Sequence, residues 1–248
     1  MLLNVEHLKV EFYDRSVPFA AVEDFSLQME EGEVVGVVGE SGSGKSMTAH
    51  ALMGLIRRSE VDISGRALFG GADLLSMSRS ELRRYQGKEL SIIFQEPMTS
   101  LNPTMKIGRQ VEDALRVHTR LTGEERRARA LEAMALAGLP EPEKLYACYP
   151  HQLSGGMRQR VALIRTLAAG PDILLLDEAF SALDYQTRLA VTDDVYGILK
   201  KEGVTTLMVT HDIPESISMG DRAVSYTHLD VYKRQGSHPA RPPGPRCR

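Results

Sequence analysis

The chain has 248 residues and a formal net charge of −3, with 42% of its residues hydrophobic and 25% charged. This composition is typical of a soluble globular protein long enough for one large domain, and it excludes a fibre or a disordered chain. The longest apolar runs, 34–38 and 173–176, are far shorter than the roughly 20 residues of a membrane-spanning helix, so any membrane role is expected to be peripheral. The acidic charge argues against a nucleic-acid surface. Two distant cysteines and an N-terminus without a secretory signal favour a cytoplasmic location.

The first part of the chain alternates short strands with polar segments. Residues 8–12 alternate as an edge strand does, and 26–29 have the pattern of a second strand, which predicts antiparallel strands at the start. The β-branched run 33–38 has the length of a buried strand, and helix formers with apolar spacing follow at 47–55. Further expected elements are strands at 63–69 and 90–94 and a polar helical segment ending at Arg84.

Beyond Gln95 the pattern becomes helical. A capping box at Thr122 and Glu125 opens a helix that Gly138 ends. We therefore expect a mainly helical insert over residues 98–169. The remaining expected elements are strands at 173–176 and 205–209 with a helix over 188–200 between them, which continue the strand-bearing core.

The last stretch of the chain breaks this pattern. From Tyr226 onward the sequence has no periodicity and ends in a proline-rich run. Residues 230–235 are what the genetic code gives for a sequencing-library adapter read in frame. We expect the native sequence to end near Val224 and residues 225–248 to be a non-native, disordered tail.

Residues 39–46 fit the pattern G-x-x-x-x-G-K-[ST] between the expected buried strand and a helix N-terminus. Such glycines let successive backbone N–H groups surround phosphates, with Lys45 reaching the outer phosphates and the Ser46 hydroxyl holding Mg²⁺. The loop residues expected to contact the nucleotide are Gly39, Glu40, Ser41, Gly42, Ser43 and Gly44. The pattern predicts an ATP site rather than a structural glycine turn.

Polar side chains follow three further expected strands. Asp177 ends a buried strand and can anchor Mg²⁺ through water, while the adjacent Glu178 can orient and polarise an attacking water. Taken alone, this pair could also be an acidic turn, but the upstream phosphate loop favours catalysis. His211 ends another strand, within reach of a γ-phosphate, and Gln95 ends a third, where its amide can contact Mg²⁺ or the lytic water. By itself, His211 could equally be a structural histidine, and Gln95 alone means little.

A second phosphate-binding segment lies at residues 153–157, Leu-Ser-Gly-Gly-Met. Ser154 can cap a helix expected over 157–169, and Gly155 and Gly156 expose N–H groups at its positive end. One chain can hardly present both segments to one phosphate if the insert projects sideways. The arrangement that fits is two domains packed head to tail, each completing the site of the other.

The order of phosphate loop, Gln95, Leu-Ser-Gly-Gly-Met, Asp177-Glu178 and His211 resembles the ATP-binding subunit of a bacterial ABC transporter over residues 1–224. The resemblance implies an α/β fold, with a P-loop NTPase core of the ABC type, an antiparallel β subdomain and the inserted helical subdomain. It implies ATP bound between two such subunits. The remaining nucleotide contacts implied are Phe12 or Tyr13 stacking on adenine, Met47 after the loop, and Asp184 in the segment 181–184 along the dimer seam.

The resemblance also implies partners: a second ATP-binding subunit, integral membrane permease subunits docked on the helical insert, and indirectly a substrate-binding protein. Gln95 would link hydrolysis to the permease, and the subunit would lie peripherally on the cytoplasmic face of the plasma membrane. Two residues depart from the family pattern. Met157 stands where glutamine is more frequent, and Ala179 stands where proline usually follows the glutamate and is expected to loosen that turn.

The subfamily resemblance divides along the chain. Residues 95–103 and 149–153 resemble dipeptide, oligopeptide and nickel importers, whereas 179–188 and 211–219 resemble nitrate, sulfonate and taurine importers. The two meet near 154–160, so a chimera joined there is expected. Uptake of di- or oligopeptides, or nickel, is the leading prediction. The alternatives are a nitrate, sulfonate or taurine importer, and a truncated ATP-binding fragment that does not dimerise productively.

Overall fold

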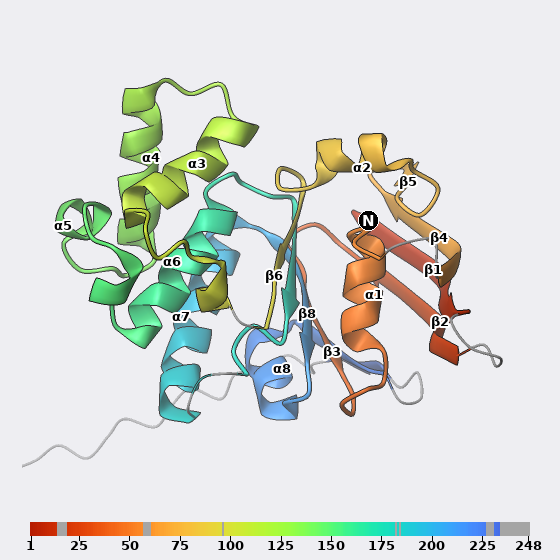
Figure 1. The fold of residues 1–248 in the computed structure, drawn as a ribbon. Coiled ribbons are helices and arrows are strands. Elements are labelled where there is room, and N and C mark those ends of the chain that lie inside the picture. Colours follow the sequence, from red (N-terminus) through yellow and green to blue (C-terminus); the bar gives the residue numbers. More distant parts are fainter. Residues whose placement is uncertain are drawn as a thin grey trace, which may run out of the picture.

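The computed structural model describes residues 1–13, 19–56, 61–95, 97–181, 183, 185–226 and 231–233. Two β-sheets and the helices packed around them make up the molecule (Figure 1). Helix α1, Lys45–Leu52, lies between the sheets, and a separate group of helices stands to one side. No helix within the described part of the chain is both long enough and apolar enough to cross a membrane.

The smaller sheet is antiparallel and has the strand order β2-β1-β4-β5. Its strands are β1 (Leu3–Phe12), β2 (Phe19–Met29), β4 (Val61–Phe69) and β5 (Ala72–Asp73). Val10 at the centre pairs with Val22 on one side and Ile63 on the other, and the inward-facing apolar residues are buried. The antiparallel strands expected from the first part of the sequence are confirmed, and they are longer than predicted.

The larger sheet has the order β10-β9-β3-β8-β7-β6. Its strands are β3 (Val34–Val38), β6 (Leu90–Ile93), β7 (Ile173–Asp177), β8 (Thr205–Thr210), β9 (Arg222–Ser225) and β10 (Val231–Lys233). All neighbours are parallel except β10, which pairs antiparallel with β9. Every residue of β3, β7 and β8 is buried, as parallel strands covered on both faces require.

The two faces of the larger sheet carry different cores. Leu175 points toward α1 and the antiparallel sheet, whereas its neighbours Leu174 and Leu176 point toward the opposite face. That face is covered by α7 (Tyr185–Glu202) and α8 (Ile213–Met219). Because side chains alternate along a strand, one five-residue strand contributes to both cores.

The helical insert has a core of its own, formed by residues such as Ile107, Met134 and Val161. Its elements are η1 (Pro97–Ser100), α3 (Ile107–His118), α4 (Gly123–Leu136), α5 (Pro142–Tyr146), η2 (Pro150–Gln152) and α6 (Gly155–Leu167). The predicted capping box of Thr122 and Glu125 opens α4 as expected. Helix α2 (Arg79–Tyr85) lies apart from this group, beside the antiparallel sheet (Figure 1).

Three sequence expectations need correction or comment. Helix α1 begins at Lys45 instead of residue 47, because Gly44 adopts a left-handed conformation that starts the helix, and it ends at Leu52. Helix α6 begins at Gly155 instead of residue 157, because Ser154 caps it directly. In the expected tail, β10 pairs with β9, while residues 227–230 and 234–248 lie outside the described residues, so the proposed end of native sequence stays a prediction.

Candidate functional site

The phosphate loop connects β3 to α1 and closes around one lysine. Lys45 Nζ donates to the carbonyl oxygens of Gly39 at 2.8 Å and Glu40 at 2.6 Å, and to Ser43 Oγ at 3.3 Å. Only 3% of Lys45 is exposed. Burial lowers the pKa of its ammonium group, and the negative charges of Glu178 and Asp177 oppose that shift. The loop therefore holds a cation at the place where outer phosphates would bind.

Glycine is required in this loop for a physical reason. Gly44 has φ of 95°, and a Cβ there would lie 1.9 Å from the backbone carbonyl oxygen of Ala21 on β2. Gly42 has φ of 82°, but no atom lies within 4 Å of the position of its absent Cβ. Both need backbone freedom, and Gly44 also needs the space.

Two oxygen ligands suited to Mg²⁺ meet at the carboxyl end of β7. The Ser46 hydroxyl donates to Asp177 Oδ1 at 2.6 Å, and the Asp177 side chain is 8% exposed. Hard oxygen donors from a hydroxyl and a carboxylate fit Mg²⁺, which is held by few protein ligands and by substrate phosphates. His50 was not anticipated: its Nε2 lies 3.1 Å from Asp177 Oδ2. Its position four residues after Ser46, on the same face of α1, was the available signal.

Glu178 follows β7 and brings three expected residues together. Its backbone has φ of 47°, and its N–H donates to the carbonyl of Val209 on β8. Glu178 Oε2 lies 3.4 Å from Gln95 Nε2 and 3.4 Å from His211 Nδ1. The carboxylate is 18% exposed and His211 is 49% exposed. Side chains from the ends of β6, β7 and β8 thus converge beside the phosphate loop.

The turn after Glu178 is anchored from the helical insert. Gln159 on α6 is buried, and its Nε2 donates to the carbonyl oxygen of Ala179 at 2.6 Å. Ala179 itself is 3% exposed. The expected loosening of this turn is therefore opposed by a buried hydrogen bond from a residue that sequence reasoning did not single out.

The second phosphate-binding segment is built at the start of α6. Ser154 Oγ accepts a hydrogen bond from the N–H of Met157 at 3.3 Å, as an N-cap does. Beyond the adjacent residues and the helix's own backbone, no atom of the described residues lies within 4 Å of where a Cβ on Gly155 or Gly156 would be. None of the hydrogen bonds of the described residues joins this segment to the phosphate loop. Its N–H groups thus lie at an open surface.

The remaining expected contacts divide into described and undescribed residues. Phe12, at the end of β1, packs against the core, whereas Tyr13 beside it is 53% exposed. Met47 on α1 is also packed against the core. Asp184 lies outside the described residues. The adenine contact and the contacts of Met47 and Asp184 stay predictions.

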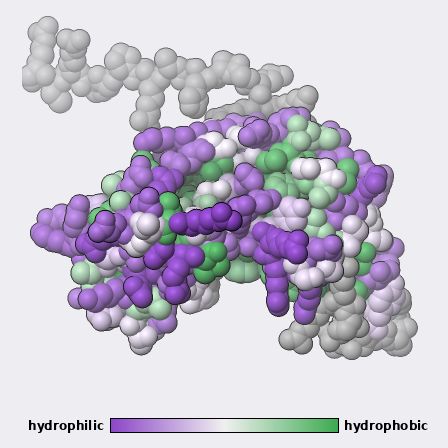
Figure 2. All heavy atoms as spheres, turned by 90° about the horizontal axis from the view of Figure 1, so that it is seen from above, coloured by the Kyte–Doolittle hydropathy of each residue, from purple (hydrophilic) through white to green (hydrophobic). Residues whose placement is uncertain are grey.

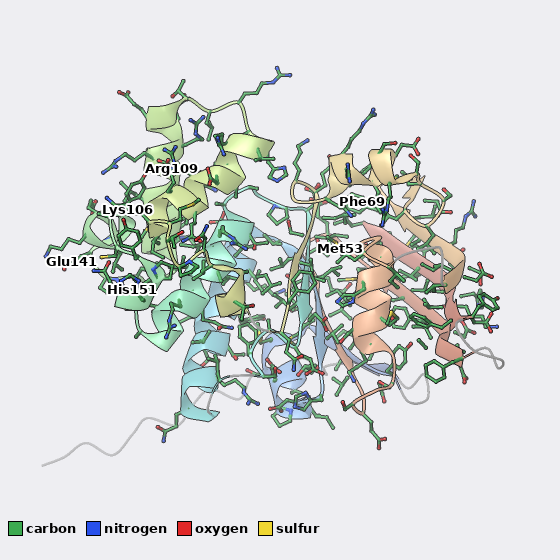
Figure 3. All side chains as sticks on the ribbon, viewed as in Figure 1. Met53, Phe69, Lys106, Arg109, Glu141 and His151 are labelled. Atoms are coloured by element: carbon green, nitrogen blue, oxygen red, sulfur yellow. The ribbon has the colours of Figure 1, made fainter. Side chains whose placement is uncertain are left out.

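A cleft of about 470 Å³ separates the helical insert from the core. Apolar residues of both sides line it, among them Met53 after α1 and Met105 before α3. Polar residues in its lining include Asp113, His118 and Arg165. Figure 2 looks down on the molecule and shows the surface hollowed between the two parts, and Figure 3 places Met53 on one side and Arg109 on the other.

Comparison with known proteins gives consistent matches. Residues 22–181 match the family described as ABC transporter. The dipeptide transport ATP-binding protein DppD of Escherichia coli is 42% identical over 217 residues, covering 86% of this chain and 65% of that protein. The oligopeptide transport ATP-binding protein OppD of Bacillus subtilis is 40% identical over 227 residues, covering 91% of this chain and 63% of that protein. The chain thus spans slightly less than two thirds of the length of these relatives.

A solved structure agrees with these matches. The dimeric structure of a post-hydrolysis state of an ATP-binding cassette, bound to ADP and Pi, superposes with a TM-score of 0.79 at 29% identity. The superposition covers 95% of this chain and 100% of the chain of the solved cassette. The expected fold class, a P-loop NTPase core with an antiparallel sheet and inserted helices, is confirmed.

Proposed function

The chain belongs to the ABC transporter family, and on that premise we propose that it is the ATP-hydrolysing subunit of a bacterial importer. One observation carries the proposal. Glu178 lies 3.4 Å from both Gln95 and His211, directly beside the Ser46 and Asp177 pair. Phosphoryl transfer to water needs a phosphate cradle, a metal carboxylate and a group that orients water, and these residues provide all three.

The residues divide the chemistry between them. Lys45 and the N–H groups of the loop would bind the outer phosphates, and Ser46 with Asp177 would hold Mg²⁺. When bound, Mg²⁺ would neutralise negative charge on the phosphates. Glu178 accepts a hydrogen bond from the attacking water and so aligns and polarises it. His211, whose Nδ1 lies 3.4 Å from Glu178 Oε2, would contact the γ-phosphate as well.

The test of this proposal is ATP hydrolysis by the wild type and by Glu178→Gln. A general base accelerates a reaction roughly 10²- to 10⁴-fold, so kcat is expected to fall at least ~100-fold in the variant. The affinity for ATP should stay within about threefold, because the phosphate cradle is unchanged. Glu132→Gln, an exposed carboxylate on α4 paired with Arg129, is the control and should hydrolyse at the wild-type rate. Full activity in Glu178→Gln would refute the proposed role of Glu178.

We further propose that two copies, or this chain and a related subunit, close around ATP. The support is the N-terminus of α6, where a Cβ added at either glycine would meet no described residue beyond its own helix turn within 4 Å, and the dimeric state named for the similar cassette. Light scattering on Glu178→Gln with ATP should give twice the mass found without nucleotide. A truncated fragment, the competing proposal, would bind ATP, remain monomeric and show no hydrolysis.

The proposed cargo is a di- or oligopeptide, supported by the names of DppD and OppD. Nickel uptake remains an alternative, as does uptake of nitrate, sulfonate or taurine, which the sequence after residue 160 resembles. The similarity to DppD spans 86% of the chain and so runs across the expected join, which stays a prediction. ATP hydrolysis in proteoliposomes with the permease and binding protein of its own operon, measured with each cargo in turn, separates these alternatives.

The proposed place of the subunit is the cytoplasmic face of the plasma membrane, bound to permease subunits. The cleft between insert and core supports this, because its lining combines the partly exposed apolar residues Ile92 and Met105 with charged residues. Binding proteins would contact the permease rather than this subunit. Met105→Glu, at a partly exposed position of the cleft before α3, should abolish association with permease vesicles and leave ATP hydrolysis by the isolated chain unchanged.

A further inference from the structure

One arginine joins the two segments that follow β7 and β8. Arg188, in the first turns of α7, donates through Nη2 to the carbonyl oxygens of Ser181 at 3.3 Å and Leu183 at 3.0 Å. Through Nη1 it donates to Asp212 Oδ2 at 3.2 Å. Ser181 and Leu183 belong to the segment after Glu178, and Asp212 directly follows His211. The guanidinium therefore bridges the neighbourhoods of two residues assigned to hydrolysis.

These contacts close a ring through the hydrolytic site. The N–H and the hydroxyl of Ser181 both donate to the carbonyl oxygen of Glu178, at 3.1 and 2.9 Å. Across the ring, Glu178 Oε2 lies 3.4 Å from His211 Nδ1. Starting from Glu178, the ring passes through Ser181, Arg188 and Asp212 and returns through His211. A displacement of either segment must therefore lengthen a contact of Arg188.

Hydrogen bonds within its own segment hold Asp212, the acceptor of Arg188, in place. It caps α8, where its Oδ1 accepts the N–H of Glu215 at 3.3 Å, and its own N–H donates to Thr210 Oγ1 at 3.0 Å. The Thr210 hydroxyl donates in turn to the Glu215 carboxylate. Burial raises the pKa of Glu215, and the nearby Asp212 charge adds to that effect. The segment around His211 is thus ordered by a local network that Arg188 joins to α7.

The geometry of the contacts requires arginine. A guanidinium presents five N–H groups in a rigid fork, whereas a lysine ammonium is a single point on a flexible stem. The Arg188 and Asp212 side chains are 21% and 23% exposed, so their hydrogen bonds are partly shielded from water. Two of the three acceptors are backbone carbonyls of the segment after Glu178, so the guanidinium fixes the path of that segment.

We propose that Arg188 is a positioning residue that keeps Glu178 and His211 aligned for hydrolysis. The proposal rests on the hydrolytic function proposed above. The side-chain hydrogen bonds of Arg188 go to Ser181, Leu183 and Asp212, so Arg188 acts on the site through these residues. Its loss should lower the rate of hydrolysis while leaving the phosphate cradle, and so the affinity for ATP, intact.

The test compares Arg188→Met, Arg188→Lys and a matched control. Arg160→Met is that control: Arg160 on α6 also pairs with a carboxylate, Asp194, and donates to a loop carbonyl, Gly138, but no hydrogen bond of the described residues joins it to the segments after Glu178 and His211. We expect kcat to fall at least tenfold in Arg188→Met with ATP affinity within threefold, and to recover in part in Arg188→Lys. Arg160→Met should keep kcat within twofold of the wild type. Wild-type kcat in Arg188→Met overturns the proposal.

Two further measurements distinguish a positioning role from a purely structural one. Combining Arg188→Met with Asp212→Asn should lower kcat no further than Arg188→Met alone, because both break the same bridge. A parallel loss of ATP affinity and thermal stability, with no recovery in Arg188→Lys, would instead indicate a structural role and overturn the proposal. The His211 Cε1–Hε1 signal in NMR should move in Arg188→Met and not in Arg160→Met. That signal is measured without hydrolysis, so an inactive wild type would refute the proposed function and still leave Arg188 testable.

Discussion

Two helix N-termini in this protein carry glycines suited to anions, and they are built in opposite ways. At α1, the loop surrounds the buried Lys45, and Gly44 lies so close to β2 that a Cβ would lie 1.9 Å from a backbone carbonyl. At α6, Gly155 and Gly156 have no atom within 4 Å of the place a Cβ would take. The first terminus is complete within the chain, and the second is open.

The difference shows that a glycine can be needed by the fold or by something outside it. Gly44 is needed by the chain itself, because both its φ of 95° and its surroundings exclude a side chain. Gly155 and Gly156 satisfy no such need in the described structure. If they matter, the reason must be the close approach of another group, which is what the proposed pairing of two cassettes around ATP supplies.

The largest effect is expected from Gly44→Ala. A Cβ facing a backbone carbonyl at 1.9 Å forces the loop to move, so we expect at least a 100-fold loss of ATP affinity and a destabilisation of about 2 kcal/mol or more. Gly42→Ala is the matched control, because it has a similar φ but open space, and should cost only about 1 kcal/mol. Calorimetric titration with ATP and thermal unfolding measure both quantities. Equal effects of the two substitutions would contradict the role of the Ala21 contact.

The opposite result is expected at the other terminus. Gly156→Ala should leave stability unchanged or raise it by up to ~1 kcal/mol, because alanine is the better helix former. ATP binding by the single chain should not change, whereas hydrolysis by the assembled pair should fall about tenfold or more, because the methyl group takes the space of a closely approaching phosphate. The readouts are the melting temperature, ATP affinity and the rate of hydrolysis. Lower stability of Gly156→Ala with unaltered hydrolysis would show that Gly156, like Gly44, is needed by the fold of the chain itself.

A smaller effect is expected from Ser154→Ala. It removes the cap that accepts the N–H of Met157, which costs about 1 kcal/mol of stability. It also removes one polar group from the open terminus, so hydrolysis should fall severalfold. Ser154→Thr keeps the cap and serves as the control in chemical denaturation and hydrolysis assays. Identical denaturation curves for Ser154→Ala and the wild type would show that the cap contributes nothing.

The smallest effect is a pH dependence at the closed terminus. Burial lowers the pKa of Lys45 below its ordinary value of 10.5, so the unfolded chain holds this proton more tightly than the folded one. The resulting penalty to stability is absent above 10.5 and develops as the pH falls through the range between the ordinary and the lowered value. The stability of the wild type relative to Lys45→Met should therefore rise as the pH is raised toward 10.5. Chemical denaturation of both proteins at several pH values measures this difference in stability. A difference that does not change with pH would contradict a buried ammonium group at Lys45.

Elements with a local signal were predictable from the sequence. The strand at 33–38, the capping box of Thr122 and the buried strand before Asp177 each follow from the pattern of adjacent residues, and all three are present. The starts of α1 and α6 were each misplaced by two residues. Helix ends depend on caps such as Gly44 and Ser154, whose backbone angles periodicity does not report.

The hydrolytic site was predictable as a set of residues but not as a geometry. Gln95, Glu178 and His211 were expected because each follows a strand, and parallel strands end at one edge. Their mutual distances follow from the strand order β8-β7-β6, which chain order does not contain. His50 beside Asp177 and Gln159 beside Ala179 were missed. The spacing of four residues from Ser46 was the signal for His50, whereas Gln159 on α6 had no distinctive signal.

By itself, the sequence determined the phosphate loop, since eight adjacent residues contain all the backbone freedom, charge and hydroxyl that this turn requires. It also determined the order of the motifs and hence the family. Only the tertiary structure decided that Arg188 links the segments after Glu178 and His211, and that the glycines of α6 face open space. Both depend on contacts between residues far apart in the chain, and such contacts form only when the sheet and its helices pack together.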